Sequence, residues 1–331
     1  MIINCAVVGT GIGLKHIEAI DFYKNFRVKS ICEFDKKKIK FLKRKFPKKV
    51  FFDNFDDIVK DKTINLISIA SYDEFHYSQI IKSIDFKKNI IVEKPMCLKS
   101  NELLKIINKL KKKKIFLTSN FVLRTEPIFL EMKKMIEQKK LFYIEADYLW
   151  GRLHKLTNGW RNKTKEYSII LGAAIHMIDI ILWMIGKYPT KITSFGNKIL
   201  TKNSKFKKFS FVNIVMEFTS GLIVKITANA TDSFHHSHQI KIFQTNQTLI
   251  QEESLIKKIS KGNKQIKTEF KKIQYPFKKN RKQFIRSFLD HLSGDTKLPY
   301  DFFKKQFDLM SICFAAEKSL LLNKKVKIKY L

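Results

Sequence analysis

The first 120 residues alternate short apolar runs with amphipathic helical patterns. The apolar runs have the length and β-branched content of buried strands, and helical spacing appears between them, for example over residues 14–23 and 35–46. This order predicts a parallel, doubly wound α/β sheet. The runs are residues 2–9, 28–34, 66–71, 89–93 and 115–120.

After about residue 121 the pattern changes to longer alternating segments without helices between them, which predicts an open, mostly antiparallel sheet. We therefore expect two domains, residues 1–120 and residues 121–331. The alternating segments are 141–152, 191–200, 208–218, 222–231 and 239–245, and residues 257–272 suggest a charged hairpin. Helices are expected over Pro127–Lys139, Arg281–Leu292 and Tyr300–Leu322.

The chain carries a formal net charge of +35, which raises the question of nucleic-acid binding. Only 7 of its 65 basic residues are arginines, and arginine is the favoured reader of phosphates and guanines. The lysines are spread among Ile, Phe and Asn, all of which have A/T-rich codons. We interpret the charge as a solvated lysine coat that favours anionic substrates, and we expect no specific nucleic-acid partner.

The apolar stretch Ser168–Gly186 is nearly long enough to span a bilayer, but it carries His176 and Asp179 near its middle. An aspartate there costs roughly 2.5 kcal/mol or more on insertion, so a buried helix of a globular domain is the better interpretation. We expect no membrane partner. Four widely separated cysteines and a chain that opens directly into a strand pattern, without a signal peptide, suggest a reducing cytoplasm.

A glycine turn joins the first predicted strand to its helix in VVGTGIG, where Gly9, Gly11, Ile12 and Gly13 would line a pyrophosphate on the helix N-terminus. The spacing is one residue tighter than GxGxxG. Glu33 follows 20 residues after Gly13 at the end of the second strand, where a carboxylate can bind a ribose 2′-hydroxyl and repel a 2′-phosphate. This predicts NAD rather than NADP; the alternative is a tight turn without a ligand.

The run IIVEKP places Glu93 and Lys94 at the carboxyl end of a central strand, sealed by a proline that favours an extended backbone before it. Ligands of doubly wound sheets lie beyond these strand ends. An ammonium group there can bind a reacting oxygen and stabilise an alkoxide-like transition state. The alternative for Lys94 is an exposed lysine without a role.

Together these features resemble the glucose–fructose oxidoreductase, inositol dehydrogenase and rhizopine-catabolism (Gfo/Idh/MocA) family along nearly the whole chain. The matching segments are GTGIG with His16, SIASYDEFH (68–76), VEKP, SNFVLR (119–124) and GAAIHMIDIILWMIG (172–186). Residues 148–161 are similar to a branch of sugar-modifying members linked to surface glycans. The resemblance implies a Rossmann domain and a second α/β domain whose open sheet often forms homodimers or homotetramers.

The resemblance also implies hydride transfer between nicotinamide and a carbon of a sugar, amino sugar or nucleotide-linked sugar. It makes Lys94 the lysine of the catalytic centre and His176 the acid/base, a role that suits an imidazole near neutral pH. It places Ser71 and His76 beside the cofactor. Glu93 would contact the cofactor or hold the turn. Without the resemblance, His176 would be interpreted as a core histidine.

One position departs from the family pattern. Many relatives carry Asp four residues before this histidine, where this chain has Gly172. Asp179, three residues after His176 on the same helical face, could steady the imidazole or bind substrate. The loss also raises a second hypothesis, an NAD-binding regulatory or scaffold protein without turnover.

Three further residues are candidates for substrate binding. Trp160 can stack on a sugar face, and Arg161 and Arg124 can clamp a carboxylate or phosphate. Loop packing and ion pairing are the alternative. The cluster HHSH (235–238) suggests a metal, but no acidic or cysteine pattern accompanies it, so we expect substrate contacts or interface packing and no metal.

Overall fold

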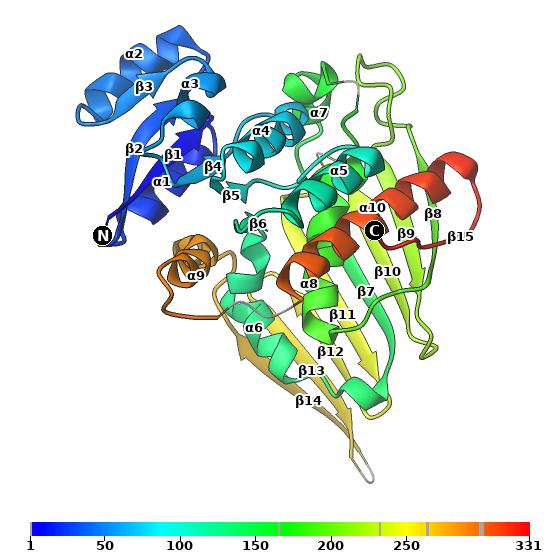
Figure 1. Ribbon diagram of the computed structural model, residues 1–331. Coiled ribbons are helices and arrows are strands. Elements are labelled where there is room, and N and C mark those ends of the chain that lie inside the picture. Colours follow the sequence, from blue (N-terminus) through cyan, green and yellow to red (C-terminus); the bar gives the residue numbers. More distant parts are fainter. Residues whose placement is uncertain (1, 165, 232, 263–264, 298–300) are drawn as a thin grey trace. The chain divides into compact units, whose positions relative to one another are not determined.

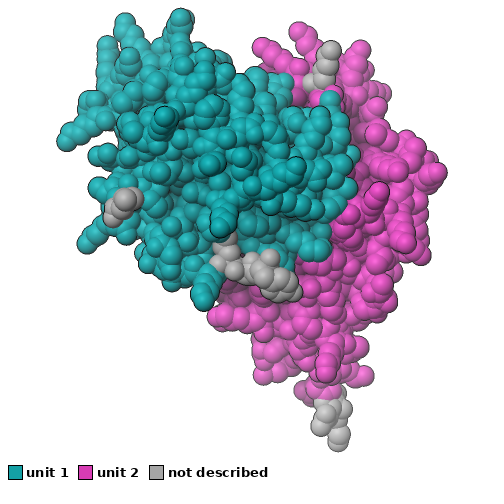
Figure 2. Space-filling view, viewed as in Figure 1, with its two compact units in different colours: residues 1–122, 279–310, 331 teal, residues 123–278, 311–330 magenta. Residues whose placement is uncertain are grey.

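A computed structural model describes the chain and shows two sheets with their helices (Figure 1). The described residues are 2–164, 166–231, 233–262, 265–297 and 301–331. The chain forms two compact units, coloured separately in Figure 2. The first unit contains residues 1–122, 279–310 and 331, and the second contains residues 123–278 and 311–330.

The first unit contains a parallel sheet of six strands in the order β3-β2-β1-β4-β5-β6. The order reverses between β1 and β4, so the carboxyl ends of these strands form the switch point where ligands of such sheets bind. The doubly wound prediction is confirmed. The strands are β1 (Ile3–Val8), β2 (Phe26–Cys32), β3 (Val50–Phe52), β4 (Leu66–Ile69), β5 (Asn89–Val92) and β6 (Leu117–Ser119).

Local sequence explains where these helices begin and which face they bury. Asp35 caps α2 by accepting hydrogen bonds from the amides of Lys37 and Lys38. In α5 the buried residues recur at helical spacing, at Leu103, Ile106, Ile107 and Leu110. The helices are α1 (Gly13–Asp21), α2 (Lys36–Lys45), α3 (Phe55–Lys60), α4 (Asp73–Asp85) and α5 (Ser100–Leu110).

The first unit is completed by residues from near the end of the chain. Helix α9 (Lys282–Leu292) contributes Ile285, Phe288 and Leu289 to a hydrophobic core. Ile17 of α1 belongs to the same core. Gln306, in the first part of α10 (Phe302–Leu322), accepts a hydrogen bond from the Ser119 amide at 2.7 Å and so caps β6. Residues 279–310 therefore belong to the first unit, whereas the sequence pattern assigned all of 121–331 to the second domain.

The second unit contains a nine-stranded sheet in the order β14-β13-β12-β11-β7-β10-β9-β8-β15. Among the described strands of this second sheet, only the β7–β10 pair is parallel, so the predicted open, mostly antiparallel sheet is confirmed. The strands are β7 (Leu141–Leu149), β8 (Lys191–Asn197), β9 (Phe211–Glu217), β10 (Ile223–Asn229), β11 (Ser237–Gln244), β12 (Gln247–Glu252), β13 (Leu255–Lys261), β14 (Ile266–Lys272) and β15 (Val326–Lys327).

Helices cover one face of this sheet, among them α6 (Pro127–Lys134) and α8 (Ile175–Ile185) (Figure 1). The strands alternate accordingly, with Ile144 and Ala146 of β7 buried and Glu145 half-buried on the opposite face. Helix α6 is shorter than predicted, because the Met135 amide bonds the carbonyl of Met132 and the chain then enters a 3₁₀ turn, Gln138–Lys140.

The apolar stretch 168–186 is a buried helix, as predicted, but it begins with a π-helical turn, Ile170–Ala174, that leads into α8. Gly186 ends it in the left-handed conformation at φ 64°. Among the helices that the structure describes, none has the length and apolar content needed to cross a membrane.

Candidate functional site

The glycine turn between β1 and α1 has little room on one side and open space on the other. Gly9 has φ +83°, and a Cβ atom there would lie 2.5 Å from the carbonyl oxygen of Ala70, so only glycine fits. A Cβ atom at Gly13 would lie 3.0 Å from Val7 Cγ1, which keeps α1 close to the sheet. At Gly11, by contrast, a Cβ atom would meet no described atom within 4 Å.

The N-terminus of α1 suits an anionic ligand. Its N-cap residue Ile12 makes no side-chain cap and is half exposed, and the first turn holds no acidic residue. The first amides of a helix have no intrahelical partner and attract phosphate. An added Cβ atom at Gly11 would have no described atom within 4 Å, so there is room beside this backbone for a dinucleotide pyrophosphate.

Glu33 follows β2 directly and is buried beneath the glycine turn. Its Oε2 accepts hydrogen bonds from the amide of Thr10, at 3.1 Å, and from the Thr10 hydroxyl. Its Oε1 accepts from the amide of Asp35 at 3.1 Å. These contacts fix a carboxylate at the end of β2, while Lys36, Lys37 and Lys38 enter α2 as the sequence predicts.

A buried polar network lies at the carboxyl ends of β4, β5 and β6. Glu93 Oε1 accepts from His16 Nε2 at 2.9 Å and from Asn120 Nδ2 at 2.7 Å. His16 Nδ1 lies 2.7 Å from the hydroxyl oxygen of Ser68. Lys94, which is half-buried, follows Glu93 directly, so the network fixes the backbone that carries Lys94.

The environment of Glu93 keeps its carboxylate charged. Burial alone would raise the pKa of Glu93, but the hydrogen bonds from His16 and Asn120 and the nearby charges of His16 and Lys94 outweigh it and hold this pKa below its usual value. These contacts favour a role for Glu93 in holding the turn over a role in contacting the cofactor. Sequence reasoning did not assign roles to Ser68, His16 or Asn120, although all three lie within the motif segments quoted above.

Ser71 lies in the loop that follows β4, and His76 lies in the first turns of α4. The His76 ring is fully buried, and its nitrogens lie 2.7 Å from the carbonyl oxygen of Pro95 and 3.2 Å from that of Ser71. The Ser71 hydroxyl donates to Gln79 Oε1 at 2.7 Å. His76 thus ties the chain after β4 to the turn that contains Lys94.

His176 is the second residue of α8 and faces the covered side of the second sheet. Its ring is stacked on Tyr148 of β7, with centroids 5.7 Å apart and planes at 9°. Tyr148 also contacts the rings of His236, at 5.2 Å, and His238, at 4.7 Å. The structure therefore gathers His176 and two members of the HHSH cluster around one tyrosine that the sequence pattern did not single out.

The remaining contacts of the HHSH cluster are aromatic and hydrogen-bonded. His238 Nδ1 forms a hydrogen bond with the Tyr275 hydroxyl, and His235 Nε2 lies 3.0 Å from Glu253 Oε1 at the surface. Across the described part of the chain, no group of three or more His, Cys, Asp or Glu side chains is arranged to hold a metal ion.

Arg124 and Asp179, both candidates for substrate binding, form an ion pair with each other. Arg124 Nε donates to Asp179 Oδ2 at 2.9 Å and Nη2 donates to Oδ1, a bidentate arrangement. Asp179 is almost completely buried on α8, and burial raises its pKa more than Arg124 lowers it. This pair anchors the helix that carries His176.

The position of the missing aspartate is filled by a tyrosine. A Cβ atom at Gly172 would lie 1.9 Å from the hydroxyl oxygen of Tyr167 and 2.4 Å from Cζ. Tyr167 is buried, and its ring contacts Trp160 and Phe206. Because Gly172 lies in the π-helical turn, its spacing from Tyr167 in the sequence does not indicate this contact.

Arg161 lies within a group of aromatic rings. Its guanidinium carbon is 4.5 Å from the Trp160 ring centroid, 5.2 Å from that of Trp150 and 5.4 Å from that of Tyr167. Its buried Nε has no hydrogen-bond partner among the residues described. Trp160 and Arg161 lie next to each other in a short 3₁₀ turn, Trp160–Asn162, and both residues are half-buried.

Two family models match most of the chain. Residues 3–121 match the oxidoreductase family with an NAD-binding Rossmann fold, and residues 129–250 match the GFO/IDH/MocA C-terminal domain. The chain belongs to this family of oxidoreductases, and its first unit is an NAD-binding Rossmann domain.

Individual relatives are distant. An inositol 2-dehydrogenase/D-chiro-inositol 3-dehydrogenase of Lactiplantibacillus plantarum is 26% identical over 226 residues, 65% of this chain and 62% of the relative. In two further oxidoreductases, from Bacillus subtilis and Synechocystis, the match spans only 44% and 52% of their length.

Solved structures share the fold over nearly the whole chain. The scyllo-inositol dehydrogenase of Lactobacillus casei, solved with NAD(H) and scyllo-inositol, has a TM-score of 0.81 at 16% identity and covers 99% of both chains. The UDP-N-acetylglucosamine 3-dehydrogenase of Acidithiobacillus ferrooxidans has a TM-score of 0.79 at 14% identity, covering 97% of this chain and 98% of that one. At such identities the similarity shows the fold alone.

Proposed function

We propose that this chain is an NAD(H)-dependent dehydrogenase. It transfers a hydride between nicotinamide and a hydroxyl or keto carbon of a sugar, amino sugar or nucleotide-linked sugar, in surface-glycan biosynthesis. The observation that carries the proposal is Lys94 at the carboxyl end of β5, on a backbone fixed by the buried contacts of Glu93 with His16 and Asn120. That end of a doubly wound sheet is where such folds carry out chemistry.

Lys94 binds the reacting oxygen of the substrate and stabilises the negative charge that develops on it. Its position depends on the Glu93 network, because a displacement of about 1 Å can cost about 100-fold in rate. His76 supports the same turn through the Pro95 carbonyl.

His176 removes the hydroxyl proton during oxidation and returns it during reduction. Its stacking on Tyr148 holds the imidazole at a fixed angle, and the Arg124–Asp179 pair anchors α8. Because Arg124 and Asp179 are paired with each other, we assign them mainly to positioning α8 and only secondarily to binding the substrate.

Gly9, Gly11, Ile12 and Gly13 hold the pyrophosphate of NAD, with Ser71 beside it, and Glu33 binds the ribose hydroxyls and disfavours the 2′-phosphate of NADP. NAD supplies the hydride acceptor when it is bound. Trp160 stacks on the sugar, and Arg161, whose buried Nε has no partner among the described residues, binds an anionic group of the substrate.

The test is NADH formation across a panel of inositols, amino sugars and nucleotide sugars, with wild type and Lys94→Ala. We expect turnover on one substrate class and a loss of at least about 100-fold in Lys94→Ala, with NAD affinity retained. Lys112→Ala serves as the control lysine. A Lys94→Ala variant that keeps most of its activity would overturn the assignment.

A second candidate is an NAD-binding regulatory or scaffold protein, because Tyr167 leaves no room for a side chain at Gly172. It predicts NAD binding without NADH formation across the whole panel. Slow NADH formation that requires His176 would eliminate this candidate.

The remaining assignments concern location and assembly. The four cysteines are free and buried, and burial raises the pKa of Cys32 to about 12, so these thiols suit a reducing cytoplasm. We propose that the chain forms a homodimer or homotetramer through the face of the second sheet opposite α8, where Tyr143 stacks on Phe243.

A further inference from the structure

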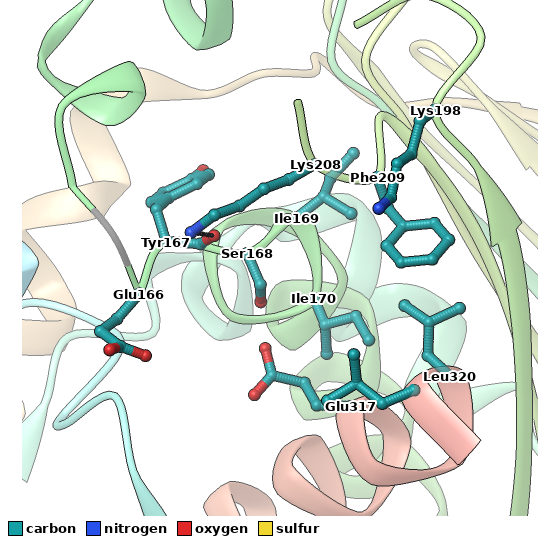
Figure 3. A pocket seen from close by; sticks show the side chains of 11 residues that line it. Glu166, Tyr167, Ser168, Ile169, Ile170, Lys198, Lys208, Phe209, Glu317 and Leu320 are labelled. Atoms are coloured by element: carbon teal, nitrogen blue, oxygen red, sulfur yellow. Dashed lines mark hydrogen bonds between the residues drawn. The ribbon is translucent and has the colours of Figure 1, made fainter. Parts of the chain in front are cut away.

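A cavity of about 320 Å³ lies within the second unit (Figure 3). Three segments that are distant in the sequence line it: residues 166–170, the connection between β8 and β9, and the last turns of α10. This volume is at the lower end of the range found for small-molecule sites. The proposed dehydrogenase reaction assigns no role to this cavity.

Most of the cavity wall is hydrocarbon. Ile169 and Ile170 form part of it, and Phe209 and Leu320 lie on one side in Figure 3. A ligand that filled the cavity would therefore need an apolar body, because polar groups left without partners against this wall would lose hydration.

Glu317 of α10 places a carboxyl group in this apolar surrounding. Its carboxyl points toward the Ser168 hydroxyl (Figure 3), and this neighbour lowers the pKa of Glu317 less than burial raises it. Ser168 Oγ also accepts from the Leu171 amide at 3.0 Å. Burial raises the pKa of Glu317 to about 7; the nearby charge of Lys208 lowers this pKa and that of Glu166 raises it further, but both effects are smaller than that of burial.

The two lysines of the cavity already use their ammonium groups elsewhere. Lys208 Nζ donates to the carbonyl oxygens of Tyr167, at 3.0 Å, and Thr164, at 3.4 Å. Lys198 Nζ lies over the Phe209 ring, 5.0 Å from its centroid. Two carboxylates line the cavity, that of Glu166, which is exposed, and that of Glu317, which is surrounded by the apolar wall. The Glu317 carboxylate accepts hydrogen bonds and does not donate them when it is ionised.

We propose that this cavity binds a small amphipathic amine, whose ammonium group donates to the Glu317 carboxylate while its hydrocarbon body packs on Phe209 and Leu320. A cation beside Glu317 also stabilises the ionised carboxyl. Since part of the Glu317 population is protonated near pH 7, binding of the ammonium releases protons to the buffer. Much less release follows at pH 9, where the carboxyl is already ionised.

Calorimetric titration of the full chain with phenethylamine tests the proposal, with 2-phenylethanol and phenylacetate as a neutral and an anionic analogue. We expect the amine to bind at least about tenfold more tightly than either analogue. Titration in two buffers of different ionisation enthalpy should show proton release at pH 7 that is smaller at pH 9. Equal or tighter binding of phenylacetate, or no amine binding, would overturn it.

Variants locate the binding. Glu317→Gln should weaken amine binding by about tenfold or more, and Leu320→Trp should block it by filling the cavity. Glu269→Gln, on the exposed strand β14, is the matched control and should bind as wild type does. Thermal melts check folding; should Glu317→Gln not fold, Leu320→Trp and the proton release still decide. Unchanged binding in Leu320→Trp would place the amine elsewhere.

Discussion

The Tyr167 hydroxyl occupies the space next to Gly172, one helical turn before His176. A Cβ atom at position 172 would lie 1.9 Å from this oxygen, a distance that real contacts do not reach. Tyr167 is itself held by Trp160 and Phe206, so it cannot easily move aside. With Tyr167 in this position there is no space for an aspartate at position 172. The two residues therefore depend on each other.

This relationship predicts a coupled effect on stability. Gly172→Ala should lower the free energy of unfolding by about 1–3 kcal/mol, because the new methyl group forces Tyr167 to shift. In a Tyr167→Leu background the same change should cost less. Denaturant unfolding of the four proteins measures the coupling. Additive effects would show that the two residues do not compete for this space.

Glu93→Gln tests the network that fixes Lys94. We expect kcat to fall roughly 10- to 100-fold, because the turn that carries Lys94 loses its charged acceptor, while NADH affinity changes less than about threefold. Stopped-flow binding and steady-state kinetics separate the two effects. Glu18→Gln on the exposed side of α1 is the control, and an unchanged kcat in Glu93→Gln would remove the network from the mechanism.

Glu33→Gln tests cofactor preference. A carboxylate at the end of β2 repels a 2′-phosphate, so its removal should lower the ratio of the NADPH to NADH dissociation constants by about tenfold. Glu74→Gln, exposed on α4, is the control. Fluorescence titration gives both constants. Tighter binding of NADPH than NADH by the wild type would show that the nearby lysines set the preference instead.

Glu317 predicts a pH dependence of stability. Its pKa in the folded chain, about 7, is above the value of 4.5 for the unfolded chain, so the native state binds more protons between these values. By linkage its contribution is most favourable below about pH 4.5 and is lost as pH rises through 7, roughly 2–3 kcal/mol between pH 5 and 8. In urea unfolding, the free energy of unfolding of Glu317→Gln should change with pH by this amount less than that of the wild type. Parallel pH profiles would contradict the raised pKa.

The open face of the second sheet predicts assembly. Phe243→Lys places a charge beside Tyr143 on that face and should shift the chain toward a monomer in light-scattering chromatography, if that face forms the interface. Phe41→Lys, at an exposed aromatic residue of α2, is the control. A wild-type monomer at micromolar concentration would remove the proposal.

Much of the fold follows from periodicity, because apolar runs and alternating segments are local signals. The exceptions are short or depend on packing. Strand β3 (Val50–Phe52) and helix α3 (Phe55–Lys60) are too short to show a period. The π-helical turn at Ile170–Ala174 lies within an apolar stretch that gives no periodic signal for it.

In the candidate site, too, the local motifs can be predicted from the sequence, whereas the tertiary contacts cannot. The glycine turn, Glu33 and the segment with Lys94 are contiguous motifs and can be identified in one sequence. The contacts of His16 with Ser68 and Glu93 join three segments far apart in the chain, and only the fold brings them together. The pairing of Arg124 with Asp179 is likewise a tertiary contact, which is why both could be taken for substrate ligands.

Helix α9 has a consequence for the synthesis of the chain. Residues 279–310 complete the first unit, and without them the apolar surface of α1 around Ile17 has no cover from Phe288 and Leu289. At about 5–20 residues per second, translation takes on the order of 10–40 s to proceed from residue 122 to residue 310. During that interval the nascent Rossmann domain is incomplete, although its first 122 residues are made first. The apolar face of α1 is then exposed and can be bound by chaperones.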